Sequence, residues 1–148
     1  MAAICRQLLP AGLEPLEERF EVRSGGLDAD RGRIVELVRG AAAVIADPSV
    51  AFDDELLDAA GDDLRVVSNF AVGYDNVDLD ACRRRGVVVT NTPGVLTEAT
   101  AELALALTLA AGRRLGDAER DLRAGRWRGW DPGAHLGLEL REATVGVI

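Results

Sequence analysis

Residues 2–92 alternate short apolar runs with amphipathic segments, and this alternation restricts the fold more than any other feature of the chain. The apolar runs are residues 3–9, 20–23, 41–46, 64–68 and 87–90. Continuous β-branched residues such as Val87-Val88-Val89 are typical of parallel strands that are buried on both faces. Five strands of this kind, separated by helices, predict an α/β fold with a parallel sheet.

The four segments between these runs carry the signals of amphipathic helices. The first has an apolar stripe made by Leu13, Leu16 and Phe20. In the other three, an aspartate that can cap the first backbone N–H groups precedes the apolar positions. The candidate caps are Asp28 or Asp30, Asp53 and Asp78; the inward positions are Ile34, Leu37 and Val38, then Leu56, Leu57 and Ala60, then Leu79 and Cys82; and the stops are Gly61 and Gly86.

Residues 1–94 are therefore predicted to form one doubly wound lobe with a five-stranded parallel sheet of the flavodoxin-like kind. Right-handed crossovers place the loops after the strands at one edge, where ligands of such sheets bind. The turn Asn-Thr-Pro-Gly at residues 91–94 combines a rigid proline with a permissive glycine, and we place the boundary of the lobe there.

Residues 95–148 are predicted to begin a different unit. A long helix is expected at about residues 98–115, with Thr97 as its N-cap. Its leucines point in several directions, so it needs neighbours on most sides. A glycine-rich irregular arm with Trp127 and Trp130 follows at residues 125–137, and residues 143–148 look like the first strand of a further domain.

The composition argues against several classes of function. A formal charge of −8 and an isoelectric point near 4.7 disfavour nucleic acids and anionic membranes as partners. All 17 basic residues are arginine, which excludes lysine Schiff bases and lysine-containing phosphate loops. Cys5 and Cys82 lack metal or redox spacing, so we expect free, buried thiols. Without a basic leader or a long apolar segment, the expected location is the cytoplasm.

Several motifs in the expected order resemble the D-isomer-specific 2-hydroxyacid dehydrogenases. They are Asn-Phe-Ala-Val-Gly-Tyr-Asp-Asn-Val-Asp at residues 69–78, Arg-Gly-Val at 85–87, Asn-Thr-Pro-Gly at 91–94 and Thr-Glu-Ala-Thr-Ala-Glu at 97–102. The arm, Gly-Arg-Trp-Arg-Gly-Trp-Asp-Pro at residues 125–132, is most similar to the glyoxylate/hydroxypyruvate reductase branch. The resemblance covers essentially the whole chain.

The resemblance implies that the main-chain amides of Val72 and Gly73 hold the carboxylate of the substrate, with Ala71 shaping the pocket beside them. Converging N–H groups suit an anion, and a glycine lets the backbone approach it. From the pattern alone, a tight turn that needs a glycine only for its conformation is the better interpretation; the resemblance reverses this preference. Similar proteins have a threonine near the cofactor at the position of Thr100, so Thr100 and Val72 are candidate cofactor contacts. Ordinary helix-end hydrogen bonding is an equal alternative for Thr100.

In this family the Gly-x-Gly-x-x-Gly turn, the residue that selects NAD or NADP, and the catalytic Arg, Glu and His come later in the chain. We therefore expect no catalytic residue within residues 1–148 and most of the NAD or NADP site beyond them. The only histidine, His135, is interpreted as a surface or dimer-arm residue. Asp47 is interpreted as a turn residue rather than a phosphoacceptor, and the pairs Asp53-Asp54 and Asp62-Asp63 as caps and turns rather than metal ligands.

By this resemblance the chain is interpreted as part of an oxidoreductase that transfers a hydride between NAD(P)H and a small 2-oxoacid such as glyoxylate or hydroxypyruvate. The fragment alone is expected to be inactive, and a homodimer through the long helix and the arm is expected. The alternatives are a phosphoglycerate dehydrogenase-type enzyme, a non-enzymatic dinucleotide-sensing corepressor-type relative, and a stand-alone flavodoxin-like signalling or flavin domain.

Overall fold

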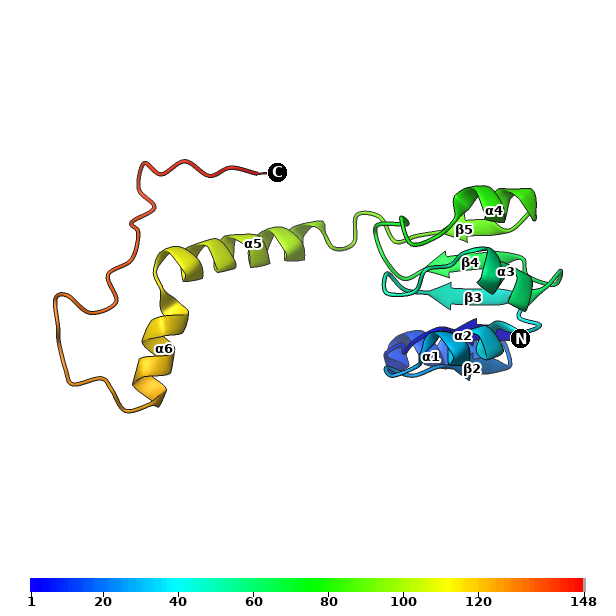
Figure 1. The fold of residues 1–148 in the computed structure, drawn as a ribbon, viewed down its shortest axis with the longest axis horizontal. Coiled ribbons are helices and arrows are strands. Elements are labelled where there is room, and N and C mark those ends of the chain that lie inside the picture. Colours follow the sequence, from blue (N-terminus) through cyan, green and yellow to red (C-terminus); the bar gives the residue numbers. More distant parts are fainter. Residues whose placement is uncertain (148) are drawn as a thin grey trace. The chain divides into compact units, whose positions relative to one another are not determined.

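A computed structural model describes residues 1–147, which divide into two compact units. Unit 1 is Met1–Val95, and unit 2 begins at Leu96. The sheet of unit 1 contains the strands β1 (Ala2–Ile4), β2 (Val22–Ser24), β3 (Ala43–Ala46), β4 (Val66–Asn69) and β5 (Val88–Thr90), and Figure 1 shows β3, β4 and β5 side by side.

The strands lie in the order β2-β1-β3-β4-β5, and every neighbouring pair is parallel. This is the strand order of flavodoxin-like sheets, in which ligands bind outside the carboxyl ends of the strands. The prediction of a parallel, five-stranded, flavodoxin-like sheet is therefore confirmed.

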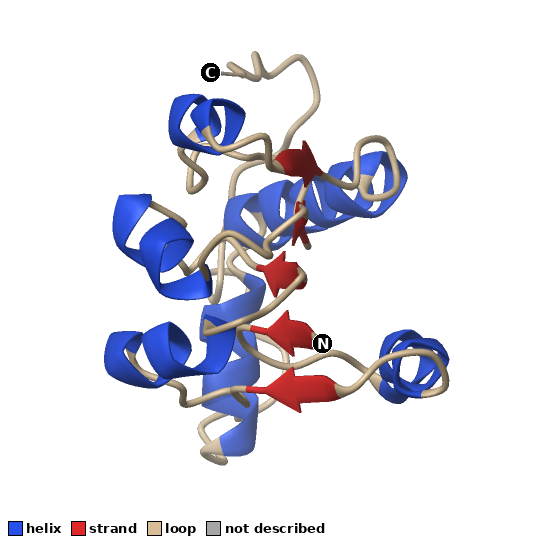
Figure 2. Cartoon of the chain, turned by 90° about the vertical axis from the view of Figure 1, so that its right-hand side faces the viewer, coloured by secondary structure: helices blue, strands red, loops and turns tan. Residues whose placement is uncertain are grey.

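Three helices cover one face of the sheet, α2 (Arg31–Val38), α3 (Asp54–Ala60) and α4 (Leu79–Arg84) (Figure 2). Each begins at a predicted aspartate cap, whose carboxylate accepts a hydrogen bond from a backbone N–H three residues later; the caps are Asp30, Asp53 and Asp78. The predicted inward residues Ile34, Leu37, Val38, Leu56, Leu57, Ala60 and Cys82 are buried, whereas Leu79 is only half-buried.

The core of unit 1 lies between these helices and the sheet, and Phe52 is its largest fully buried side chain. Phe52 also joins two loops, because its backbone N–H donates to the Asn76 carbonyl at 2.7 Å and its carbonyl accepts from the Asp78 N–H at 3.0 Å. Phe52 and Val77 form an isolated parallel bridge. The loops that follow β3 and β4 are thus held together at the carboxyl edge of the sheet.

The opposite face of the sheet carries only α1 (Pro10–Glu17) among the elements of unit 1 (Figure 2). No residue of α1 is buried, and Phe20 lies beyond its end with 52% of its surface exposed, so the predicted stripe is wrong for Phe20. Val88 of β5 is 59% exposed. The prediction of burial on both faces is therefore wrong for β5, because no helix of unit 1 covers that part of the sheet.

Both cysteines are free and buried, as predicted. Burial, reinforced by the nearby negative charge of Asp47, raises the pKa of the Cys5 thiol to about 12. Burial also raises the pKa of the Cys82 thiol. Both sulfur atoms are therefore protonated and unreactive at neutral pH, since the thiolate is the reactive form.

Unit 2 contains two helices, α5 (Thr97–Gly112) and α6 (Leu115–Arg123), instead of the single helix predicted to residue 115. The break occurs at Arg114, which has a left-handed φ of 54° and bonds to Asp117 in the first turn of α6. The prediction of Thr97 as N-cap is also wrong, because the helix starts one residue earlier: Leu96 is the cap and provides no side-chain bond.

The leucines of α5 lie all round the helix, as predicted, and Leu103, Leu105, Leu107 and Leu109 are all exposed within residues 1–147. No helix in this described range is long and apolar enough to span a bilayer. The arm at 125–137 is irregular, as predicted. Residues 143–147 form no strand, because an extended segment without a neighbouring strand has no partner for ladder hydrogen bonds.

We predict that Phe52→Ala destabilises the chain by about 3–5 kcal/mol, because it removes a fully buried aromatic ring and leaves a cavity. The matched control Phe20→Ala removes a half-exposed ring and should cost less than about 1 kcal/mol. Urea unfolding followed by circular dichroism measures both. Equal losses for the two variants would contradict the placement of the core.

Candidate functional site

The predicted substrate residues lie in the loop between β4 and α4, at the carboxyl edge of the sheet. Ala71 is half-buried, Gly73 is exposed, and 43% of the surface of Val72 is exposed. Phe70 and Thr92, which flank this loop, line an apolar hollow of about 570 Å³ together with α1. The structure therefore places the loop where a ligand can reach it.

Carbonyl groups of this loop are hydrogen-bonded to other parts of unit 1. The donor groups belong to the last residue of β4, to the segment after β5, to the loop before α3 and to the segment just before α4. The bonds are Thr92 N–H to Ala71 O at 2.9 Å, Asn91 Nδ2 to Val72 O at 2.8 Å, Asn69 Nδ2 to Gly73 O at 2.8 Å, Val77 N–H to Tyr74 O at 3.0 Å, and Phe52 N–H to Asn76 O at 2.7 Å.

The N–H groups of the same loop behave differently. Within residues 1–147, none of the backbone N–H groups of residues 71–76 donates a hydrogen bond. No peptide bond is cis, so the oxygen and the N–H of each peptide group point in opposite directions. The Ala71 and Val72 carbonyls are bound to Thr92 and Asn91, so the N–H groups of Val72 and Gly73 point away from those two residues. Successive N–H groups in such a loop form an anion-binding concavity. We call the N–H groups of Val72 and Gly73 the anion rim.

Gly73 is not required for the conformation of the turn. Its φ lies outside the left-handed region, and a Cβ built on it would come no closer than 3.8 Å to any other group, the nearest being the Asp75 carboxylate. An alanine would therefore fit the described chain. The absence of a side chain leaves open space beside the rim, which favours the interpretation of close approach by a ligand over that of a turn requirement.

Two asparagines hold the loop, Asn69, which is buried, and Asn76, which is half-buried, and sequence reasoning assigned no role to either. Asn69 is fully buried and exchanges hydrogen bonds with Asn76, at 2.9 Å and 3.1 Å. The Asn76 amide also donates to the carbonyls of Asp47 and Val50, both at 3.0 Å. The pair joins three segments through neutral groups, and all its donors face carbonyl oxygens. The signal in the sequence was an asparagine that ends an otherwise apolar strand.

The charged groups in the rim loop are unfavourable for binding an anion. The Asp75 carboxylate lies beside Gly73, and residues 70–78 include no arginine. Two hydrogen bonds from neutral amides must then act against a nearby negative charge. A tightly held carboxylate would need a cation in addition, since charge-assisted hydrogen bonds are the stronger ones.

The two candidate cofactor residues belong to different units. Val72 is in unit 1, and Thr100 is exposed in the first turn of α5. The Thr100 hydroxyl makes no hydrogen bond within residues 1–147, whereas Thr108 bonds back to the Ala104 carbonyl at 2.8 Å. The hydroxyl of Thr100 is thus free for a ligand. The sequence contains no Gly-x-Gly-x-x-Gly turn, so neither residue belongs to a dinucleotide-binding motif of that kind.

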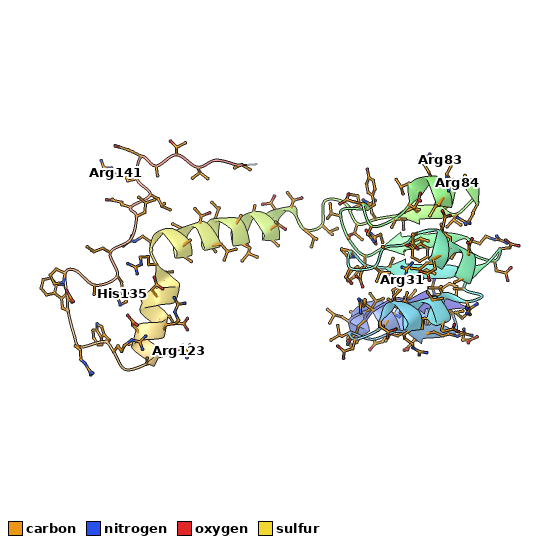
Figure 3. All side chains as sticks on the ribbon, viewed as in Figure 1. Arg31, Arg83, Arg84, Arg123, His135 and Arg141 are labelled. Atoms are coloured by element: carbon orange, nitrogen blue, oxygen red, sulfur yellow. The ribbon has the colours of Figure 1, made fainter. Side chains whose placement is uncertain are left out.

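Asp47 and Asp53, which were interpreted as a turn residue and a cap, have those roles. Asp47 accepts hydrogen bonds from the N–H and hydroxyl of Ser49, at 2.7 Å and 2.6 Å. Asp53 binds Arg31, shown in Figure 3. Partial burial raises the pKa of Asp53, but hydrogen bonds from Arg31 and the Leu56 N–H outweigh this effect and hold the pKa below its usual value. Residues 1–147 contain no cluster of three or more metal-ligating side chains.

His135 lies in the arm of unit 2, beside α6 (Figure 3). Its Nε2 atom is 3.5 Å from the Asp121 carboxylate, and its backbone has a left-handed φ of 53°. It faces a hollow of about 410 Å³ lined by arm residues such as Trp127 and Trp130. The geometry assigns His135 to the local packing of the arm and gives it no part in unit 1.

Comparison with known proteins identifies relatives of this arrangement. Residues 2–137 match the family model described as D-isomer specific 2-hydroxyacid dehydrogenase, catalytic domain. The chain is 39% identical to the glyoxylate reductase of Thermococcus litoralis and 42% identical to that of Thermococcus kodakarensis, in each case over 98% of this chain and 45% of the relative. The chain thus spans a little less than half the length of these curated relatives.

Solved structures are similar to the chain over the same extent. A protein from Thermus thermophilus superposes with a TM-score of 0.88 at 41% identity, over 94% of this chain and 45% of that one. The NADPH-dependent glyoxylate/hydroxypyruvate reductase of Sinorhizobium meliloti, in complex with NADP and malonate, has a TM-score of 0.76 at 38% identity, over 95% and 43%.

We predict that Gly73→Ala changes the free energy of unfolding by less than about 1 kcal/mol, because the new methyl group meets open space. The same variant should weaken the binding of small carboxylates, because the methyl group occupies space beside the rim. Urea unfolding and an NMR titration with glyoxylate measure the two effects. A loss of stability above about 2 kcal/mol would instead show that the turn itself requires glycine.

Proposed function

The chain belongs to the D-isomer specific 2-hydroxyacid dehydrogenase family, and on this basis we propose that unit 1 holds the carboxylate of a small 2-oxoacid in an NAD(P)-dependent glyoxylate or hydroxypyruvate reductase. One observation carries the proposal: Val72 and Gly73 present free backbone N–H groups on a loop whose carbonyls are bound to the protein. The named relatives support the choice of substrate, since those compared above are glyoxylate reductases.

The ligands of a solved relative agree with a carboxylate site. The Sinorhizobium reductase was crystallised with NADP and malonate, and also with citrate. Both acids carry carboxylates, as glyoxylate and hydroxypyruvate do. In this chain the group best suited to a carboxylate is the anion rim, because it offers two adjacent uncommitted donors at the ligand-binding edge of the sheet.

The anion rim positions the substrate for the reaction. In a 2-oxoacid the reacting carbonyl is the next carbon after the carboxylate, so two hydrogen bonds to the carboxylate fix the distance and direction of that carbonyl. The small side chain of Ala71 leaves room beside it. NAD(P)H, when bound, would supply the hydride. We assign no catalytic residue to residues 1–147.

Unit 2 is proposed to serve the cofactor side and self-association. The free Thr100 hydroxyl is the proposed contact to NAD or NADP, together with Val72 of unit 1. The exposed leucines of α5 form an extended apolar surface, which marks an interaction site in soluble proteins. We propose that α5 and the arm pair two copies of the chain in the cytoplasm.

The alternatives have less support. A phosphoglycerate dehydrogenase-type enzyme or a non-enzymatic dinucleotide-sensing corepressor would use the same lobe. The reductase is preferred because the arm with Trp127 and Trp130 resembles the glyoxylate/hydroxypyruvate reductase branch, and the compared relatives are glyoxylate reductases. A flavin domain would hold its phosphate in the loop after β1, where this chain has Leu8, Leu9 and Pro10 instead of small polar residues.

We predict that glyoxylate binds the 148-residue chain weakly, with a Kd on the order of 10 mM, and shifts the amide NMR signals of Val72 and Gly73. Asp75→Asn should tighten the binding severalfold, because it removes the negative charge beside the rim. No NADPH-dependent loss of glyoxylate should occur. Unchanged signals at Val72 and Gly73, or a steady turnover by the purified chain, would contradict the proposal.

We also predict that the chain self-associates, because α5 exposes apolar surface on all sides. Sedimentation velocity at about tens of micromolar should show dimers or larger species. Replacing Leu103 and Leu107 with glutamate should shift the population toward monomer, whereas Leu9→Glu in unit 1 should not. A purely monomeric wild-type chain would rule out α5 as the association surface.

A further inference from the structure

The segment that follows β5 donates two hydrogen bonds to the rim loop. Asn91 Nδ2 donates to the Val72 carbonyl at 2.8 Å, and the Thr92 N–H donates to the Ala71 carbonyl at 2.9 Å. The acceptors, Val72 and Ala71, are distant from Asn91 and Thr92 in the sequence and belong to the loop after β4. Neither bond is needed to close the sheet, because the paired residues of β4 and β5 end at Ser68 and Thr90.

The Asn91 bond controls the direction of one particular donor. The Val72 carbonyl and the Gly73 N–H belong to the same trans peptide group and point in opposite directions. Holding the oxygen toward Asn91 therefore aims the Gly73 N–H away from Asn91, toward open space. The Thr92 bond acts in the same way on the peptide group that contains the Val72 N–H.

We propose that Asn91 is a positioning residue for carboxylate binding: its side-chain amide fixes the peptide group that presents the Gly73 N–H. The inference rests on the proposed carboxylate function of the rim and extends it to a residue that makes no contact with the ligand. An amide is required at this position, because an aspartate of the same shape has no hydrogen to donate to a carbonyl.

The position of Asn91 also relates the rim to the connection between the units. Asn91 and Thr92 stand just before Pro93 and Gly94, and unit 2 begins at Leu96. Gly94 has a left-handed φ of 80°, so this connection turns immediately after the two donors. The two hydrogen bonds from residues 91–92 thus link the direction of the rim peptide groups to the conformation of the segment just before Pro93.

The test compares Asn91→Ala with Thr92→Ala in the 148-residue chain. Asn91→Ala removes the donor to the Val72 carbonyl, whereas Thr92→Ala keeps the backbone N–H that bonds to Ala71 and serves as the matched control. Residual dipolar couplings report the direction of the Gly73 N–H bond without any ligand, and an NMR titration with glyoxylate reports the affinity. Thermal unfolding reports whether the fold is retained.

In the Asn91→Ala variant, the residual dipolar coupling of the Gly73 N–H should change, whereas those of the β-strand N–H groups should stay the same. The affinity for glyoxylate should fall about tenfold. Thr92→Ala should match the wild type in all three measurements. If Asn91→Ala does not fold, the same measurements are made on the isosteric variant Asn91→Asp, which also lacks the amide donor. An unchanged Gly73 coupling, or wild-type affinity in Asn91→Ala, overturns the role of Asn91.

The two proposals fail in different ways. If the wild-type chain binds no glyoxylate while Asn91→Ala still reorients the Gly73 N–H, the carboxylate function is wrong and only the structural part of the inference survives, so the positioning role in binding is overturned with it. If the wild type binds and Asn91→Ala binds equally well, the carboxylate function stands and the inference about Asn91 falls.

Discussion

The candidate site depends on one constraint: the two polar ends of a trans peptide group cannot face the same way. In the loop after β4, Asn69, Asn91 and Thr92 donate to successive carbonyls, and the N–H groups of Val72 and Gly73 point away from Thr92 and Asn91 and donate no hydrogen bond within residues 1–147. The Asn69–Asn76 pair supports this arrangement, because Asn69 is fully buried and an unpaired buried amide would cost about 1–3 kcal/mol. The loop therefore offers neutral backbone donors, and the charged group beside Gly73 is the Asp75 carboxylate.

The sheet and its helices could be predicted because their signals are local. Apolar runs gave the strands, and Asp30, Asp53 and Asp78 gave the starts of three helices, because a cap acts on the N–H groups two or three residues away. The wrong predictions concern features that have no such local signal, or features that depend on contacts between residues distant in the sequence. The break at Arg114 and the N-cap of α5 at Leu96 rather than Thr97 are of the first kind, and the exposure of Val88 is of the second.

The candidate site was predictable only in part. The rim residues Val72 and Gly73 were identified through resemblance, and their role in binding stays a prediction. The reason for their geometry was not accessible, because Asn69, Asn76 and Asn91 come together only when the loops after β3, β4 and β5 meet at one edge. The rim also lacks a cation within its own loop, and the leucines of α5 are exposed within residues 1–147.

The most direct measurement is a crystal structure of the chain with oxamate, a stable analogue of a 2-oxoacid. The account predicts the oxamate carboxylate at the loop after β4, with its oxygens about 2.7–3.1 Å from the backbone nitrogens of Val72 and Gly73 and with Asn91 still bonded to the Val72 carbonyl. Oxamate bound at another surface, or a loop whose N–H groups are turned inward onto protein carbonyls, would contradict it.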